Sequence, residues 1–165
     1  MKELTLHQEL HCSAERFWEL FFDPEFSREM IVDGLGFASC EIDPVLDEGA
    51  WRKRTMRVQP KLDVPAAVAK LLGPRLGYTE HGKLDTRTQH WSYDIVLSVL
   101  SDRIRMGGKV RIESTGPNRC VRHSDLWVDV RILGVGGLVE RAAEHNMRDG
   151  WNRSAAWMND VFLRR

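Results

Sequence analysis

Two arginines, Arg52 and Arg54, are the residues whose type and spacing most clearly suggest ligand chemistry. They lie in the segment 51–58, which has the pattern of a strand, and there they share one face with Met56 and Val58. A guanidinium inside a mostly apolar wall needs an anion, and its planar fork fits a carboxylate or a phosphate. We therefore expect Arg54 to hold the polar group of a ligand, with Arg52 nearer the mouth of the site.

A second interpretation of the same segment needs no ligand. Glu41 and Asp43 lie on the neighbouring predicted strand, where they could pair with Arg52 and Arg54 on the water-facing side of a sheet. Arginines paired in this way would be structural. The sequence leaves both interpretations open.

Acid–base chemistry would need a titratable side chain that faces the same interior. His81, His90 and His123 could supply it, because the pKa of histidine lies near neutrality. Their positions favour the surface or the edge of a strand, and we assign no catalytic residue. Tyr93 and Asp94 are the other candidates, and the tyrosine hydroxyl can reach an interior cavity. Tyr93 shares the apolar face of its strand with Trp91, Ile95 and Leu97.

No motif for a metal, a nucleotide or a covalent nucleophile is present in the sequence. Cys12, Cys40 and Cys120 are odd in number and far apart, so we expect reduced, mostly buried thiols rather than a zinc site. The glycines of the segment 134–137 are too closely spaced for a dinucleotide-binding loop, and there is no HExxH, P-loop or GxSxG sequence. We expect no metal and no cofactor.

The composition is that of an ordinary globular chain. Its 165 residues suit a single domain over residues 1–165 with a sizeable core. Lys plus Arg and Asp plus Glu number 24 each, so the net charge is zero and nothing favours nucleic acid as a partner. The N-terminus lacks the apolar run of a signal peptide, and no stretch approaches the roughly 18 apolar residues of a spanning helix. We expect a cytoplasmic protein.

Seven strands and several helices must position these residues. Alternation of apolar and polar residues predicts the strands, and the short turns between most of them require antiparallel neighbours. Ser13 caps a helix that ends at Asp23, and a second short helix covers about 25–32. The predicted strands cover residues 4–11, 37–46, 50–59, 76–84, 90–100, 103–113 and 119–133.

The predicted sheet has one apolar and one polar face. In the segment 103–113, Met106 and Val110 lie on one side, while arginines and a lysine share the other. The segment 119–133 repeats this pattern, with Leu126 on its apolar side. A sheet with one face in water needs another element to cover the opposite face.

The segment 135–163 supplies that cover. It contains no proline and carries an apolar stripe at helical spacing over about eight turns, or roughly 40 Å. Such a helix can lie across the concave face of the sheet, where Met147, Trp151 and Met158 would form the floor of a cavity. The stripe consists of Val139, Ala143, Met147, Trp151, Ala155, Met158 and Phe162.

The segment 64–72 is a further candidate for a functional element. Val68 and Leu72 belong there to a predicted helix that is almost wholly apolar, with one lysine as its only charge. Packed inward, this helix would extend the core. Exposed, it would be a lid that opens against a membrane, with Lys61 and Arg75 near anionic headgroups.

The order of one strand, two short helices, six strands and a long helix resembles that of the START and polyketide-cyclase superfamily (SRPBCC, helix-grip). The segment 17–26 resembles the helix, Asp-Pro and helix at the start of many members, and the segment 130–140 resembles the strand-to-helix junction of a bacterial START-like family of unknown function. The segments 64–73 and 78–81 show a weaker similarity to PRELI-type phospholipid-transfer proteins.

The resemblance implies an α+β, helix-grip fold. A curved seven-stranded antiparallel sheet would surround the long C-terminal helix, with two short helices after the first strand. PRELI-type proteins shuttle acidic phospholipids with a small protein partner, but no protein partner of this chain can be inferred from its sequence. The superfamily hosts enzymes, transporters and ligand sensors, so the resemblance predicts the fold more directly than the function.

These observations favour a domain that binds, and could transfer, a lipid or other hydrophobic small molecule in a cavity between the sheet and the C-terminal helix. The expected partners are that molecule and, transiently, a membrane surface. Two alternatives stay open: a polyketide-cyclase-like enzyme with a hydrophobic substrate, and a ligand-free protein-interaction module. The candidate ligand-binding residues are Arg52, Arg54, Met56, Val68, Leu72, Tyr93, Ile95, Met106, Val110, Leu126, Met147, Trp151 and Met158.

Overall fold

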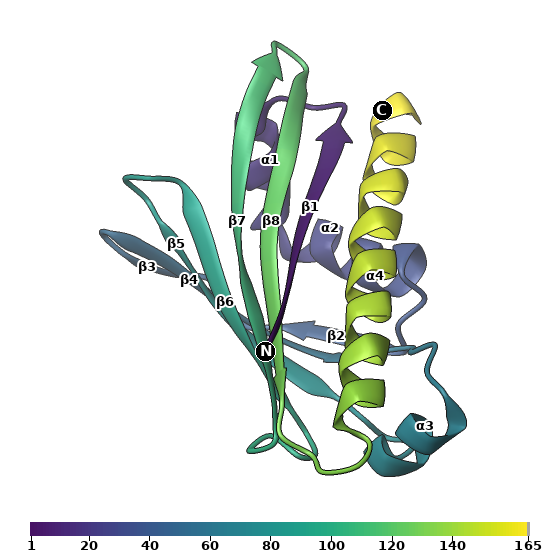
Figure 1. Cartoon of the computed structure of the whole chain (residues 1–165). Coiled ribbons are helices and arrows are strands. Elements are labelled where there is room, and N and C mark those ends of the chain that lie inside the picture. The colour runs from purple at the N-terminus through teal and green to yellow at the C-terminus, as the bar shows by residue number, and fades with distance from the viewer. Residues whose placement is uncertain (165) are drawn as a thin grey trace.

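One antiparallel sheet curves around a long C-terminal helix in the computed structural model, which describes residues 1–164 (Figure 1). The strands are ordered β1-β8-β7-β6-β5-β4-β2, and β3 also pairs with β4. The strands are β1 (Lys2–Leu10), β2 (Ser39–Ile42), β3 (Leu46–Glu48), β4 (Trp51–Gln59), β5 (Tyr78–Asp85), β6 (His90–Leu97), β7 (Ile104–Gly116) and β8 (Arg119–Val130). The helices are α1 (Ala14–Phe21), α2 (Pro24–Glu29), the π-helix η1 (Met30–Gly34), α3 (Ala66–Leu72) and α4 (Gly136–Arg164).

Side-chain caps start the first two helices where the sequence predicts them. The Ser13 hydroxyl accepts a hydrogen bond from the backbone N–H of Arg16, and the Asp23 carboxylate accepts one from the backbone N–H of Glu25. Such caps satisfy donors that a helix N-terminus otherwise leaves unpaired. The second helix runs on through η1 to Gly34, two residues beyond the predicted end.

The predicted sheet is confirmed, with one segment divided in two. The predicted strand 37–46 forms β2 and the start of β3, and both pair with β4. Pro44 lies between them, and a proline has no N–H to contribute to a strand ladder. The sheet therefore contains eight strands where the sequence predicts seven.

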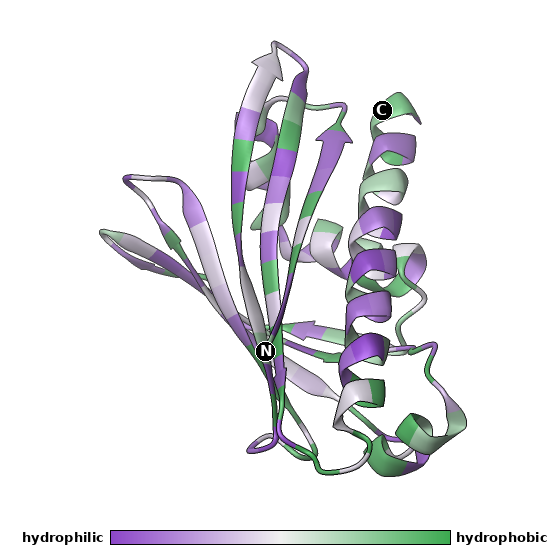
Figure 2. Ribbon diagram, viewed as in Figure 1, coloured by the Kyte–Doolittle hydropathy of each residue, from purple (hydrophilic) through white to green (hydrophobic). Residues whose placement is uncertain are grey.

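The predicted faces of the sheet are also confirmed. Ile104 and Val110 of β7 are buried, whereas Arg105 and Lys109 between them are exposed. In β8, Leu126 is buried in the same way. Figure 2 shows hydrophilic and hydrophobic residues alternating along these strands. The apolar face is the concave one, toward α4 (Figure 1).

The helix α4 covers the concave face and packs against β1, β8, η1 and α3. Gly134 adopts φ 84°, a left-handed conformation that lets the chain turn from β8 into the helix. Val139, Ala155 and Met158 of the predicted stripe are buried, and the other stripe residues are partly buried. Among residues 1–164, no helix has both the length and the apolar composition needed to cross a bilayer.

Candidate functional site

A cavity of about 250 Å³ lies between the concave face of the sheet and α4. Helices α1, α2, η1 and α3 contribute to its walls, which are mostly apolar. A dry protein cavity of about 150 Å³ suffices for benzene, and small-molecule pockets range from about 300 to 1,000 Å³. The cavity can therefore accept a small apolar body.

The structure brings all but two of the predicted ligand-binding residues to this cavity. Arg52 does not line it, because its half-exposed side chain pairs with Asp47 at 2.8 Å outside the wall. Leu126 is only 2% exposed and packs with Leu6 and Trp91 inside the core. The predicted residues that line the cavity are Arg54, Met56, Val68, Leu72, Tyr93, Ile95, Met106, Val110, Met147, Trp151 and Met158.

Arg54 is buried in the wall with an anion supplied by the chain itself. Its Nη2 lies 2.8 Å from Glu80 Oε1, and its Nη1 donates a hydrogen bond to the backbone oxygen of Phe21 at 2.8 Å. The guanidinium also lies over the rings of Phe21 and Trp91, at 4.1 and 5.2 Å from their centroids. Glu80 therefore compensates the positive charge that the sequence predicts to be available to a ligand.

The water-facing interpretation of Arg54 is wrong. Arg54 is 6% exposed and points to the concave side. The carboxylates of Glu41 and Asp43 instead pair with Arg57, at 3.6 and 2.6 Å, on the opposite face of β4. The Arg57 guanidinium also lowers the pKa of the Asp43 carboxyl.

A second buried arginine, Arg122 of β8, also lines the cavity, and sequence reasoning missed it. It is 3% exposed. Its Nε donates to Gln8 Oε1 at 3.2 Å, and its Nη2 donates to the backbone oxygen of Trp151 at 2.8 Å and to Ser154 Oγ at 3.0 Å. Burial lowers the pKa of Arg122 to about 9, so the guanidinium still carries its proton at neutral pH.

A signal for Arg122 was present in the strand pattern. Because side chains alternate along a strand, Arg122 must share the concave face with Ser124 and Leu126. The predicted apolar face was assigned only from Leu126 onward. Extending the alternation four residues back would have placed a guanidinium in the interior.

The candidate acid–base residues mostly lie away from the cavity. His81, His90 and Asp94 are exposed, and His123 binds Glu113 at 2.7 Å on the polar face of the sheet. Tyr93 does line the cavity, but burial raises the pKa of its hydroxyl well above the ordinary value of 10, which keeps it protonated. None of the described lining residues is a histidine.

The helix α3 packs inward and closes one end of the cavity. Val68 and Leu72 are 2% and 9% exposed and join a core cluster with Val139 of α4. Lys61 and Arg75, on either side of the helix, are exposed. The structure therefore shows the inward-packed arrangement of this helix.

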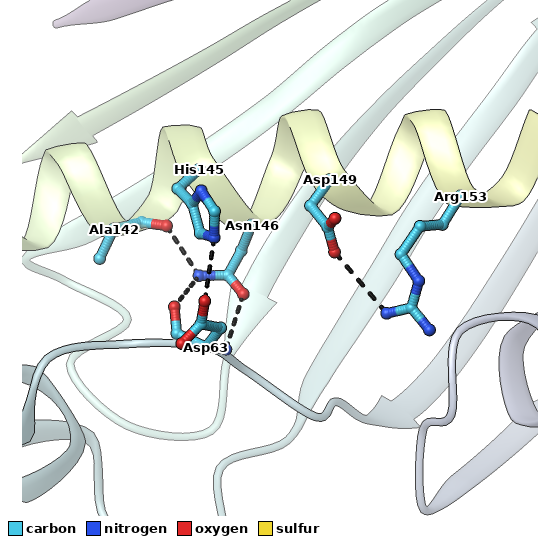
Figure 3. Close-up of polar contacts among 6 residues, drawn as sticks. All are labelled: Asp63, Ala142, His145, Asn146, Asp149 and Arg153. Atoms are coloured by element: carbon cyan, nitrogen blue, oxygen red, sulfur yellow. Dashed lines mark hydrogen bonds and ion pairs between the residues drawn. The ribbon is translucent and has the colours of Figure 1, made fainter.

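Two α4 residues tie the segment before α3 to the terminal helix (Figure 3). Asn146 accepts a hydrogen bond from the backbone N–H of Asp63 at 3.0 Å and donates one to the Asp63 backbone oxygen at 2.9 Å. His145 Nε2 lies 3.1 Å from the Asp63 carboxylate. We call these contacts the Asp63 clamp. They hold the segment that leads into α3 against α4.

A larger depression, of about 700 Å³, lies on the opposite face of the sheet. Its walls include Lys53, Lys83 and Lys109, together with Asp94 and Asp125. It is open to water, and its charges of both signs favour no single class of ligand. The mostly apolar cavity under α4 is therefore the candidate site.

The fold resembles several solved structures along nearly its whole length. A START superfamily protein from Mycobacterium smegmatis aligns with a TM-score of 0.66 at 13% identity, over 97% of this chain and 98% of that one. The Zhui aromatase/cyclase from Streptomyces sp. R1128 aligns with a TM-score of 0.58 at 16% identity, over 95% and 93%. Norcoclaurine synthase from Thalictrum flavum, in complex with dopamine and hydroxybenzaldehyde, aligns with a TM-score of 0.63 at 16% identity, over 99% and 87%. These likenesses confirm the START-like helix-grip fold.

The chain belongs to the family described as a protein of unknown function, DUF2505, whose model matches residues 5–161. A search of curated protein sequences found no match. The resemblance to the START and polyketide-cyclase superfamily is thus confirmed at the level of the fold. The weaker similarity to PRELI-type proteins receives no support from these comparisons.

Proposed function

We propose that residues 1–165 act as a single START-like domain that binds a hydrophobic small molecule, or the apolar part of a lipid, in the cavity under α4. The observation that carries this proposal is the mostly apolar cavity of about 250 Å³ that the sheet and α4 leave between them. Transfer of apolar surface out of water stabilises such a complex by about 25 cal/mol per Å². Binding of this kind requires no catalytic group.

The similar structures support a small ligand rather than a filled interior. Norcoclaurine synthase holds dopamine and hydroxybenzaldehyde, and its chain shares this fold. Here the proposed contacts come from the sheet, from α3 and from α4, with Met147 and Met158 as adaptable parts of the wall. The ligand-free interaction module is less well supported, because it would have a packed interior.

The likeness to an aromatase/cyclase and to norcoclaurine synthase favours an enzyme as the second candidate function. Within the cavity, Tyr78, Tyr93 and Glu80 are titratable residues that could handle protons. Glu80 is already paired with Arg54 at 2.8 Å, and the Tyr93 hydroxyl has a raised pKa. Binding therefore remains the preferred proposal.

Replacing each of two alanines on α4 by phenylalanine, in separate variants, tests the proposed binding. Ala143 lines the cavity, whereas Ala156 lies on the exposed side of the same helix. Ala143→Phe would fill part of the cavity, so decanamide, a neutral apolar probe, should bind at least about tenfold more weakly, a change of about 1.4 kcal/mol. Isothermal titration calorimetry measures this, with circular dichroism to confirm folding.

Ala156→Phe adds the same ring to the same helix and should leave the affinity unchanged. Native mass spectrometry of the purified protein, followed by lipid extraction, would identify any ligand that copurifies. Equal affinity of Ala143→Phe and the wild type for decanamide would show that the cavity is not where the probe binds.

A further inference from the structure

We propose that the cavity selects apolar ligands that carry one anionic group, and that Arg122 binds this group. The inference rests on the proposed function, because it specifies the ligand of the same cavity. The relevant ligand is a small amphipathic anion, with a carboxylate or a phosphate monoester on an apolar body.

The positive charge of Arg122 has no counter-charge in the protein. All three of its hydrogen-bond acceptors are neutral: the Gln8 side-chain amide, the Trp151 backbone oxygen and the Ser154 hydroxyl. Within residues 1–164, no carboxylate forms an ion pair with it, although it is only 3% exposed. A buried charge without an opposite charge is costly to a folded protein, so this arrangement indicates a partner outside the chain.

The charged side chains that line the cavity carry one more positive than negative charge. The described lining residues include two guanidiniums, Arg54 and Arg122, and one carboxylate, Glu80. Glu80 lies 2.8 Å from Arg54 and matches its charge. Tyr93 and Tyr78 also line the cavity, but burial raises the pKa of both hydroxyls, so they contribute no negative charge near neutral pH. A single bound anion would therefore balance the cavity.

Neighbouring side chains hold the Arg122 guanidinium in place before any ligand arrives. Gln8, which accepts from its Nε, is itself fixed by a 3.0 Å hydrogen bond to Asn152 Oδ1. The guanidinium lies 4.5 Å from the ring centroid of Trp151. Its Nη1 makes no hydrogen bond to any described residue, which leaves donors for a ligand. A preorganised donor loses little freedom on binding and so favours affinity.

Arg54 is the less suitable anion site, even though it shares the cavity. An anion bound there would have to compete with Glu80 for the guanidinium or be repelled by that carboxylate. At Arg122 the same anion would meet no acidic side chain. We therefore assign to Arg122 the anion-binding role that the sequence predicts for Arg54.

The test compares two probes of the same size that differ in charge, decanoate and decanamide. Hydrogen bonds to charged groups are stronger than neutral ones, so the wild type should bind decanoate about tenfold to a hundredfold more tightly at neutral pH. Arg122→Gln should lose this preference and still bind decanamide. Decyl phosphate in a third titration shows whether the site takes a carboxylate or a phosphate monoester better.

Two further variants secure the interpretation. Arg105→Gln removes an exposed arginine from the other face of the sheet and should keep the preference for decanoate. Arg122→Met fills the space of the side chain without its charge, and it replaces Arg122→Gln if that variant fails to fold. Each titration is run on the full chain.

The outcomes separate this inference from the proposed function. If the wild type binds decanamide and decanoate equally well, or if both Arg122 variants keep the preference, the anion site is disproved while the cavity remains a binding site. If the wild type binds none of the probes, the proposed function fails, and this inference fails with it.

Discussion

At the scale of single residues, the buried positive charge of Arg122 lowers the stability of the ligand-free protein. Replacing a buried ion pair by apolar residues of similar volume is often neutral, or stabilising by about 1–4 kcal/mol, and Arg122 lacks a partner whose attraction would offset its desolvation. Arg122→Met also leaves Gln8 and Ser154 without a donor, which offsets part of that gain. We therefore predict that the free energy of unfolding of the ligand-free protein stays within about 1 kcal/mol of the wild type or rises. Urea denaturation measures it.

The difference in free energy of unfolding between Arg122→Met and the wild type should depend on pH. Burial lowers the pKa of Arg122 from its ordinary value to about 9, so in the pH range between these two values the unfolded chain binds more protons than the folded one. The cost of Arg122 is then fully present below pH 9 and decreases as the pH rises above it. The advantage of Arg122→Met should be largest near neutral pH. A loss of more than about 3 kcal/mol on substitution would instead identify Arg122 as a structural anchor.

The sequence predicted the cavity wall better than the ion pairs within it. Alternation along a strand places Arg54, Met106 and Val110 on the concave face without any knowledge of the register. The pairing of Arg54 with Glu80 depends on how β4 aligns with β5, where Glu80 lies opposite Met56. Strand register comes from packing of the whole sheet, so a partner on the next strand could not be assigned from one segment alone.

At the scale of elements, the Asp63 clamp controls how α3 closes the cavity. Asn146→Ala removes two hydrogen bonds to the Asp63 backbone, each of which contributes about 1 kcal/mol. We predict that amide hydrogen exchange in Ala66–Leu72 becomes several-fold faster, because the helix opens locally more often. Hydrogen–deuterium exchange with mass spectrometry resolves α3 from α4.

Asp149→Ala is the matched control, because Asp149 is an exposed residue of the same helix whose carboxylate pairs, among the described residues, only with Arg153 (Figure 3). It should leave exchange in α3 unchanged. Equal exchange rates in Asn146→Ala and the wild type would mean that Val68 and Leu72 hold α3 closed by packing alone.

The elements themselves were largely predictable, and their interruptions were not. A proline-free apolar stripe at helical spacing identified α4 to within one residue at each end. The division of the strand 37–46 and the π-helix at Met30–Gly34 depend on local backbone geometry. At Gly34, a Cβ would lie 2.9 Å from the Trp157 ring of α4, so the course of this segment follows from a contact distant in sequence.

At the scale of the whole molecule, the loop between β8 and α4 lies at the end of the molecule where α3 lies (Figure 1), and two of its apolar residues are exposed. Leu133, between β8 and α4, is 99% exposed, and Val135 beside it is 37% exposed. We call these two residues the β8–α4 tip. Because the cavity end closed by α3 lies nearby, contact of this tip with a membrane would bring the cavity close to its source of ligand.

The charges near this tip indicate which membranes it would contact. The net charge of the chain is zero, and Arg131 lies 3.1 Å from Asp129. Arg103 similarly lies 3.9 Å from Asp102. Lys61, Lys70 and Arg75, around α3 at the same end, are exposed and form no ion pair with any described residue. Binding would therefore combine insertion of apolar side chains with attraction to anionic headgroups.

We predict weak, reversible binding to phosphatidylcholine vesicles that strengthens when anionic lipid is added and weakens again when salt is added. Leu133→Asp should abolish it, because a carboxylate resists insertion among acyl chains. Leu163→Asp is the control: Leu163 is also highly exposed, at 77%, but it lies at the opposite end of α4 (Figure 1). Vesicle flotation measures the bound fraction. Loss of binding in Leu163→Asp as well, or retention of binding in Leu133→Asp, would remove the tip as the membrane-contacting surface, whereas ligand binding in the cavity would be unaffected.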